Sequence, residues 1–407
     1  MVIDYDKHPS FSIPNLPGAV LPEEFNRFNS FYKLLKTHGR TMSSSDIARI
    51  KEECCVLLRR IFTFTGGALK ASSNRQEIFL TELHQHVLAM LNEDIKFFTW
   101  KMRNTLPQMS GSLDSIENAA KLNNDKFFTV NINLDVVREM LDISKNELDI
   151  FRKSAKLGKT NRENLSINEG GLILQLIKIL NIELNNKGFN DAVSIYMGRS
   201  RKVNGLALEL SVPEAVWWRN PYPELNQPPK TLYYHTDESL AHPKAIIYLC
   251  DVNEKNGPTS VVPNILDFFG LNPMQILIGR VICKVGRDNN SILSKVYRNK
   301  YHQVFGCEHL RADFMSLPSE MRWNSHFGSD VIPNSSIEEK LIFSEQIILG
   351  KMGTGIIFDG ANLVHRGGLV LDGERIALQV IFGESNSSLI NRSVNGVRKI
   401  SKYILHH

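Results

Sequence analysis

Hydrophobic positions in the first hundred residues recur at helical spacing. A run of serines and an aspartate at 43–46 can begin a helix, and apolar residues then follow at three-to-four spacing up to the glycines at 66–67. A second apolar face runs through 74–98. Residues 104–116 carry proline, glycine and serine and are predicted to form a loop. We therefore expect residues 1–170 to form a helical N-terminal region that supports or covers the rest of the chain.

The pattern changes near residue 191, where short β-like runs replace the long helical stripes. Many of these runs are separated by turns that contain proline or glycine. Several short strands divided by turns are typical of a β-sandwich or a barrel-like roll. The expected strands are 192–197, 205–212, 245–252, 278–285, 346–349, 354–358 and 376–382. The chain is therefore predicted to be an α+β protein, with its β-roll within residues 171–407.

Composition excludes several classes of function. Apolar residues make up 42% and charged residues 22% of the 407 positions, as in ordinary soluble proteins. The net charge of +5 is spread along the chain with no long basic stripe, so we expect no nucleic-acid partner. No apolar run approaches the ~18 residues that a spanning helix needs, so we expect no membrane partner. The five cysteines have no CxxC spacing, and the polar N-terminus resembles no secretion signal, which predicts reduced thiols in the cytoplasm.

The first candidate metal ligands are His235 and Asp237. On an extended segment, residues two apart project from the same face, so this imidazole and this carboxylate can reach one metal ion. A His-x-Asp triplet is common by chance, and a solvated turn with an ion pair would also explain it.

Two later residues complete a candidate site. His365 follows a predicted strand and precedes two glycines, so it could supply a third ligand and leave coordination positions open. Arg375 enters an otherwise apolar strand, where a guanidinium is costly unless it is paired, and its planar fork suits a bidentate carboxylate. A structural role for His365 and a buried bridge from Arg375 to Asp359 are the alternatives.

The order of these residues resembles the phytanoyl-CoA dioxygenase family of iron(II)/2-oxoglutarate oxygenases. The resemblance covers roughly residues 190–385, and its blocks are His235-Thr-Asp237 with 245–252, then 256–263, then 355–382. It implies a double-stranded β-helix (jelly-roll or cupin-like) core with added helices. It also implies that His235, Asp237 and His365 bind Fe(II), and that Arg375 anchors 2-oxoglutarate.

The chain departs from this family in two places. The stretch between Asp237 and His365 is long for the family, which indicates an insertion near residues 285–345. Position 367, where a hydroxyl could assist Arg375, is glycine. Another hydroxyl must then complete the carboxylate site, and the candidates are Thr259, Tyr248 and Tyr196.

The implied activity is hydroxylation of an unactivated C–H bond with O2, which converts 2-oxoglutarate to succinate and CO2. The expected substrate is a small-molecule metabolite; an oxygenase acting on a macromolecule and a non-catalytic β-roll that binds a ligand are the alternatives. Zinc would also suit two histidines and a carboxylate, but the Arg375 strand and the lack of an HExxH helix favour iron. The candidate substrate-binding residues are Trp217, Trp218, Tyr234 and Lys244. The oligomeric state and the substrate's identity stay open.

Overall fold

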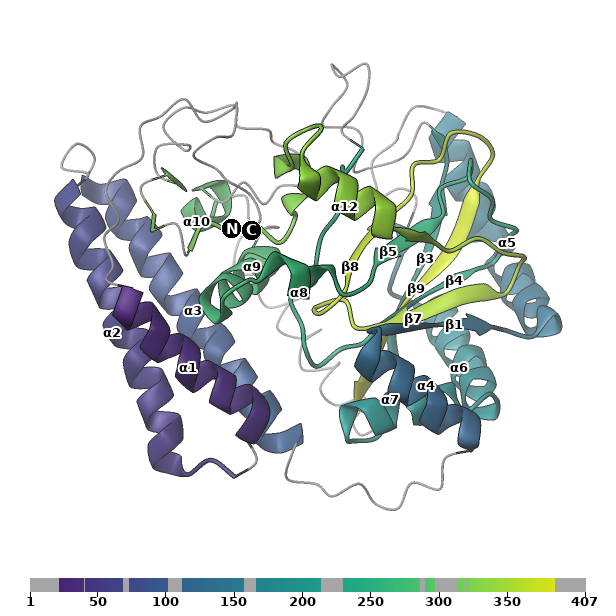
Figure 1. Ribbon diagram of the computed structural model, residues 1–407. Coiled ribbons are helices and arrows are strands. Elements are labelled where there is room, and N and C mark those ends of the chain that lie inside the picture. The colour runs from purple at the N-terminus through teal and green to yellow at the C-terminus, as the bar shows by residue number, and fades with distance from the viewer. Residues whose placement is uncertain are drawn as a thin grey trace, which may run out of the picture.

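The structure is a computed structural model of residues 1–407. It describes residues 22–39, 41–68, 73–101, 112–156, 166–213, 230–285, 290–296, 314–315, 317–318 and 321–384. Helices form one side of the molecule, and two antiparallel sheets with further helices form the other (Figure 1), so the chain is an α+β protein as expected.

Three long helices form one side of the molecule, and shorter helices from later in the chain pack against them (Figure 1). Their apolar faces share one core that contains Tyr32, Leu57, Leu83 and Leu277. The helices of this layer are α1 (Pro22–His38), α2 (Ser44–Ala68), α3 (Ser73–Lys101), α8 (Ile265–Phe269), α9 (Pro273–Val285) and α10 (Ile292–Val296).

Two antiparallel sheets form the other side. The larger has the order β1-β7-β4-β9-β3-β2 and the smaller β6-β5-β8. Tyr248, Val261, Phe358 and Ala377 belong to one apolar cluster that joins strands of both sheets. The strands are β1 (Phe127–Asn131), β2 (Ser166–Ile167), β3 (Arg201–Ser211), β4 (Lys244–Tyr248), β5 (Thr259–Val262), β6 (Gln346–Ile347), β7 (Thr354–Phe358), β8 (Val364–Gly367) and β9 (Arg375–Glu384).

A second group of helices packs against the larger sheet. Their buried residues join those of β3, β4 and β9 in one core. These helices are α4 (Leu113–Asn124), α5 (Leu134–Lys156), α6 (Gly171–Asn186) and α7 (Phe189–Met197). The remaining elements are α12 (Ser336–Ser344) and the 3-10 turn Phe327–Asp330, which belong to the region 285–345.

Two expected strands are helices. Residues 192–197 lie in α7, which has the left-handed glycines Gly188 and Gly198 at its two ends. Residues 278–285 lie in α9, which begins at Pro273 and is buried along nearly its whole length. In both segments an apolar run hides the helical period, because a helix buried on most sides reads like a buried strand.

The other expectations agree with the structure more closely. The helix expected from 43–46 is α2, which ends one residue after Gly67, and that expected at 74–98 is α3. Residues 113–116 of the expected loop begin α4 behind the cap residue Ser112, while 104–111 lie outside the described residues. The first 170 residues also supply β1 and β2 to the larger sheet, and β1 pairs with β7 along its whole length.

Candidate metal centre

The backbone brings His235 and His365 together from distant parts of the chain. The two residues form an isolated antiparallel bridge in which each amide donates to the carbonyl of the other, at 3.1 and 3.0 Å. The Asp237 amide donates to the Gly360 carbonyl at 2.7 Å. One ligand atom from each of His235, Asp237 and His365 lies within 4.8 Å of the others, and all three residues are buried. Their roles as ligands stay a prediction.

Both imidazoles have a fixed tautomer. His235 Nδ1 lies 2.9 Å from the Tyr233 carbonyl oxygen, and His365 Nδ1 lies 2.9 Å from that of Leu363. A carbonyl only accepts, so each Nδ1 carries the hydrogen and each Nε2 keeps its lone pair. Burial lowers the pKa of both histidines, that of His235 well below its ordinary value. Both rings are therefore neutral at pH 7, the state in which imidazole binds metals.

The Asp237 carboxylate has two unlike oxygens. Oδ1 lies 2.8 Å from the Lys244 ammonium. Oδ2 is buried, lies 3.6 Å from His365 Nε2, and has no hydrogen-bond partner among the described residues. Burial alone would raise the pKa of this carboxyl, but the charge and hydrogen bond of Lys244 oppose that effect, and the pKa lies below its ordinary value. Asp237 is therefore ionised, with one acceptor atom unused.

This donor set fits a divalent metal ion. Two neutral imidazole nitrogens and one carboxylate oxygen converge, and an ionised oxygen buried without a partner is unfavourable unless something binds it. Two histidines and one carboxylate with open positions are typical of non-haem Fe(II), and the same donors also suit zinc.

Arg375 is a buried cation that forms no ion pair with a carboxylate of the described residues. It is 9% exposed at the start of β9; Nη1 donates to the Gly257 carbonyl at 2.5 Å and Nη2 to Ser211 Oγ at 3.3 Å. Its Nε is buried without a partner among the described residues. The alternative bridge to Asp359 is absent, because that carboxylate instead accepts from other groups of its own surroundings. Arg375 can therefore bind an anion.

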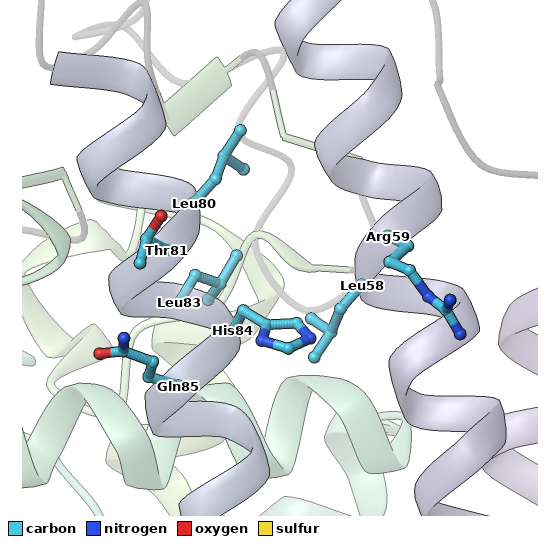
Figure 2. Close-up of a pocket in the computed structure, with 7 residues that line it drawn as sticks. All are labelled: Leu58, Arg59, Leu80, Thr81, Leu83, His84 and Gln85. Carbon is cyan, nitrogen blue, oxygen red and sulfur yellow. The ribbon is translucent and has the colours of Figure 1, made fainter. Parts of the chain in front are cut away.

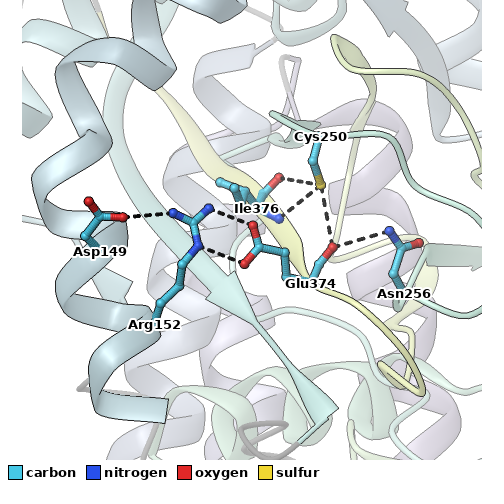
Figure 3. A network of polar contacts seen from close by, with 6 residues as sticks. All are labelled: Asp149, Arg152, Cys250, Asn256, Glu374 and Ile376. Carbon is cyan, nitrogen blue, oxygen red and sulfur yellow. Dashed lines mark hydrogen bonds and ion pairs between the residues drawn. The ribbon is translucent and has the colours of Figure 1, made fainter. Parts of the chain in front are cut away.

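A polar network fixes the residue before Arg375 (Figure 3). Arg152 of α5 binds both carboxylate oxygens of Glu374, at 2.7 and 3.0 Å. The Glu374 carbonyl accepts from Asn256 Nδ2 at 3.3 Å, and the Cys250 thiol lies against the same strand. These contacts hold the start of β9 and so the backbone that carries Arg375.

The three hydroxyl candidates lie in different surroundings. Tyr248 Oη donates to the Ile348 carbonyl at 3.0 Å and accepts from the Thr259 amide at 2.8 Å. Tyr248 pairs with Ala377, two residues after Arg375 on β9, and Arg375 donates to the carbonyl of Gly257, two residues before Thr259. Tyr196 instead donates to Asp359 Oδ2 at 2.5 Å. Of the three, Thr259 and Tyr248 lie better to assist Arg375.

The candidate substrate residues are only partly described. Trp217 and Trp218 lie outside the described residues. Tyr234 is fully buried, with the Arg366 guanidinium 4.2 Å from its ring centroid, a position that does not favour contact with a substrate. Lys244 is engaged with Asp237.

His326 lies in the expected insertion near 285–345, and no metal-ligand spacing in the sequence connects it with the candidate site. Its ring stacks on that of His235, with the centroids 4.9 Å apart and the planes 12° apart, and Tyr233 packs against His235 at 4.6 Å. Tyr233 has the left-handed φ of 69°, an uncommon conformation for a bulky residue that often marks a functional site. These rings restrain the His235 imidazole through contacts between loops.

A charged cavity of about 810 Å³ lies beside the Asp237 segment. Glu238, the residue after Asp237, lines it, as do residues of α3 and α9 and Glu384 at the end of β9. Its charged lining residues are Glu93, Lys96, Arg199, Glu238, Lys284 and Glu384. Charges of both signs indicate that this cavity suits a polar molecule.

A smaller cavity of about 250 Å³ lies between α2 and α3 (Figure 2). It is lined by Leu58, Arg59, Leu80, Thr81, Leu83, His84 and Gln85. Among the described residues, neither group of side chains that could hold a metal includes a residue of this cavity. No described helix is long and apolar enough to cross a membrane.

Comparison with known proteins finds similarity only among solved structures. No protein-family model matches the chain, and no curated protein matches it. The epimerase SnoN, solved with Fe3+, alpha-ketoglutarate and nogalamycin RO, shares 13% identity over 67% of this chain and 84% of its own, with a TM-score of 0.35. EctD from S. alaskensis, solved with 2-oxoglutarate and 5-hydroxyectoine, shares 14% over 69% and 81%, with a TM-score of 0.37. Both TM-scores are below 0.5, so neither similarity establishes the fold or the activity of this chain.

Proposed function

We propose that this chain is a non-haem iron(II) oxygenase that uses 2-oxoglutarate and O2 and hydroxylates a C–H bond of a small-molecule metabolite. The proposal includes a double-stranded β-helix core of the phytanoyl-CoA dioxygenase type. One observation carries it: the β-core contains a buried His-Asp-His set and a buried arginine, and among the described residues one Asp237 oxygen has no hydrogen-bond partner and Arg375 has no carboxylate partner. The His-Asp-His set can bind a cation, and Arg375 can bind an anion.

The protein's own groups have distinct tasks. His235 and His365 present Nε2 lone pairs, because their Nδ1 hydrogens are bonded to carbonyl oxygens, and Asp237 presents Oδ2. Iron(II), when bound, supplies the activation of O2 and the coordination of the keto acid. Arg375 binds the distal carboxylate of 2-oxoglutarate, and Thr259 and Tyr248 support it. Tyr196 is a weaker candidate for that task, because its hydroxyl is bonded to Asp359.

Zinc hydrolysis is the competing chemistry for the same three donors. A hydrolytic zinc site has no need of a second, buried cation, whereas Arg375 matches the free carboxylate of a dicarboxylic cosubstrate. Arg375 is thus the residue that favours 2-oxoglutarate chemistry.

The charged cavity supports a metabolite as the substrate. Its volume of about 810 Å³ lies within the range of roughly 300–1,000 Å³ that small-molecule sites occupy. Its lining carries both charge signs, which favours a polar molecule over a long acyl chain. A polymer would need an extended groove.

The test is anaerobic titration of the protein with Fe(II) and then 2-oxoglutarate, followed by exposure to O2. We expect a chelate absorption band on addition of 2-oxoglutarate and slow release of succinate in O2 without substrate. R375Q should weaken 2-oxoglutarate binding at least tenfold while leaving Fe(II) binding within about threefold, since losing one partner of a charged contact costs roughly 2–5 kcal/mol. A wild-type protein with no chelate band and no succinate would contradict the proposal. Binding of zinc without any 2-oxoglutarate complex would favour the hydrolytic alternative.

A further inference from the structure

Lys244 forms an ion pair with the candidate metal ligand Asp237, which a solvated lysine would not do. Its Nζ lies 2.8 Å from Asp237 Oδ1, and its side chain is 30% exposed. It is the first residue of β4, where it pairs with Phe358 on β7 and Ile381 on β9. The backbone on both sides of Lys244 is therefore fixed, and the ammonium is held beside the carboxylate.

The contact with Lys244 gives the two Asp237 oxygens different surroundings. Oδ1 pairs with Lys244, whereas Oδ2 is buried 3.6 Å from His365 Nε2 and has no hydrogen-bond partner in the described part of the chain. Gly360 restricts the carboxylate from the other side: a Cβ at that position would lie 1.9 Å from Oδ2. The carboxylate is thus held from two directions with a single oxygen directed toward the histidines.

The contact between Lys244 and Asp237 affects how many coordination positions of a bound metal ion stay open. A six-coordinate ion with two imidazoles and one carboxylate oxygen keeps three positions, enough for a chelating keto acid and one further ligand. A carboxylate that bound through both oxygens would occupy one of these three. Lys244 competes for Oδ1 and so opposes that second bond.

We propose that Lys244 is a positioning residue that keeps Asp237 a one-oxygen ligand and thereby preserves the position that 2-oxoglutarate needs. This inference rests on the proposed function. It assigns the lysine a role in cosubstrate binding that it performs without touching the cosubstrate. Loss of the ammonium should therefore weaken 2-oxoglutarate binding much more than metal binding.

The experiment compares K244M with K244R and with a control, K351M. Lys351 forms an ion pair of the same 2.8 Å length with Asp251, but its side chain is 87% exposed and it lies outside the candidate site. Fe(II) affinity and the 2-oxoglutarate affinity of the Fe(II)-loaded protein are measured anaerobically, the second from the chelate absorption band. Melting temperatures verify the fold, and K244Q replaces K244M if the methionine variant does not melt cooperatively.

We expect K244M to bind Fe(II) within about threefold of wild type, because the freed Oδ1 can also reach the ion, and 2-oxoglutarate at least about tenfold more weakly, equivalent to roughly 1.4 kcal/mol. K244R should restore 2-oxoglutarate affinity to within about threefold, and K351M should change neither. Equal loss of both affinities in K244M would make Lys244 a general structural residue and overturn the inference, as would wild-type 2-oxoglutarate affinity. Absence of the chelate band in wild type would instead overturn the proposed function, and this inference with it.

Discussion

The molecule contains two buried ionic clusters that differ in how completely their polar groups are satisfied. In the helical layer, Asp94 of α3 accepts from the Arg280 guanidinium of α9 at 2.5 Å and from the Tyr32 hydroxyl of α1 through its other oxygen. The Arg280 and Asp94 side chains are only 4% and 1% exposed. Both carboxylate oxygens are thus used within the protein.

The cluster at the β-core is incomplete. Asp237 Oδ2 and Arg375 Nε are both buried without a partner among the described residues. Burial is therefore similar in the two clusters and does not distinguish a structural site from a functional one. The unused atom alone does not either, because other buried polar atoms of the described residues also have no partner, but only Asp237 Oδ2 lies beside two histidine nitrogens.

The two clusters are also connected. Arg280 Nε donates to the carbonyl of Glu238 at 2.7 Å, and Glu238 directly follows Asp237. The helical layer therefore supports the backbone next to the candidate ligand Asp237, which is more specific than simply covering it.

The largest effect should come from removing the Arg280 guanidinium, which pairs with Asp94 in the helical layer. R280M leaves the Asp94 carboxylate buried and without its cation, which should lower the free energy of unfolding by about 3–5 kcal/mol. Denaturant unfolding followed by circular dichroism measures this. Removing all three polar partners together in Y32F/D94L/R280M should recover a large part of the loss, because no buried charge then remains. An R280M midpoint equal to that of wild type would show that this cluster does not stabilise the fold.

A smaller effect should come from binding Fe(II) at the candidate site of His235, Asp237 and His365. Fe(II) added anaerobically at 100 times its Kd should raise the free energy of unfolding by about 2.7 kcal/mol, since the ion binds only the folded chain. Thermal unfolding with and without a chelator measures the difference. D237N should abolish the increment, whereas Y32F, which alters the other cluster, should retain it. An increment that survives in D237N would place the metal elsewhere.

The smallest effect should come from displacing the unused oxygen without removing it. In G360A the new Cβ would lie 1.9 Å from Asp237 Oδ2, so the carboxylate must move. Metal affinity should fall about 10–100-fold, which is roughly 1.4–2.7 kcal/mol. G171A is the matched control, because a Cβ there meets nothing within 4 Å. Equal Fe(II) affinities in G360A and G171A would show that the carboxylate position is not critical.

Local sequence predicted secondary structure well where one face was apolar and failed where the whole element was buried. The stripes in α2 and α3 were predicted because each of these helices buries only one side. The sequence pattern predicts strands at residues that lie in α7 and α9. Burial on most sides of these helices removes the polar positions that would show the helical period. The strand 354–358 was predicted with the same bounds as β7.

By itself, the sequence determined the donor types and their order: His235 and Asp237 two apart, then His365, then an arginine entering an apolar strand. Only the tertiary structure decided that Asp237 leaves Oδ2 unused, that Lys244 holds Oδ1, and that His326 stacks on His235. Residue spacing along one segment follows from local backbone geometry, so it can be predicted. The satisfaction of a buried atom depends on neighbours from several segments, and these become neighbours only when the chain folds.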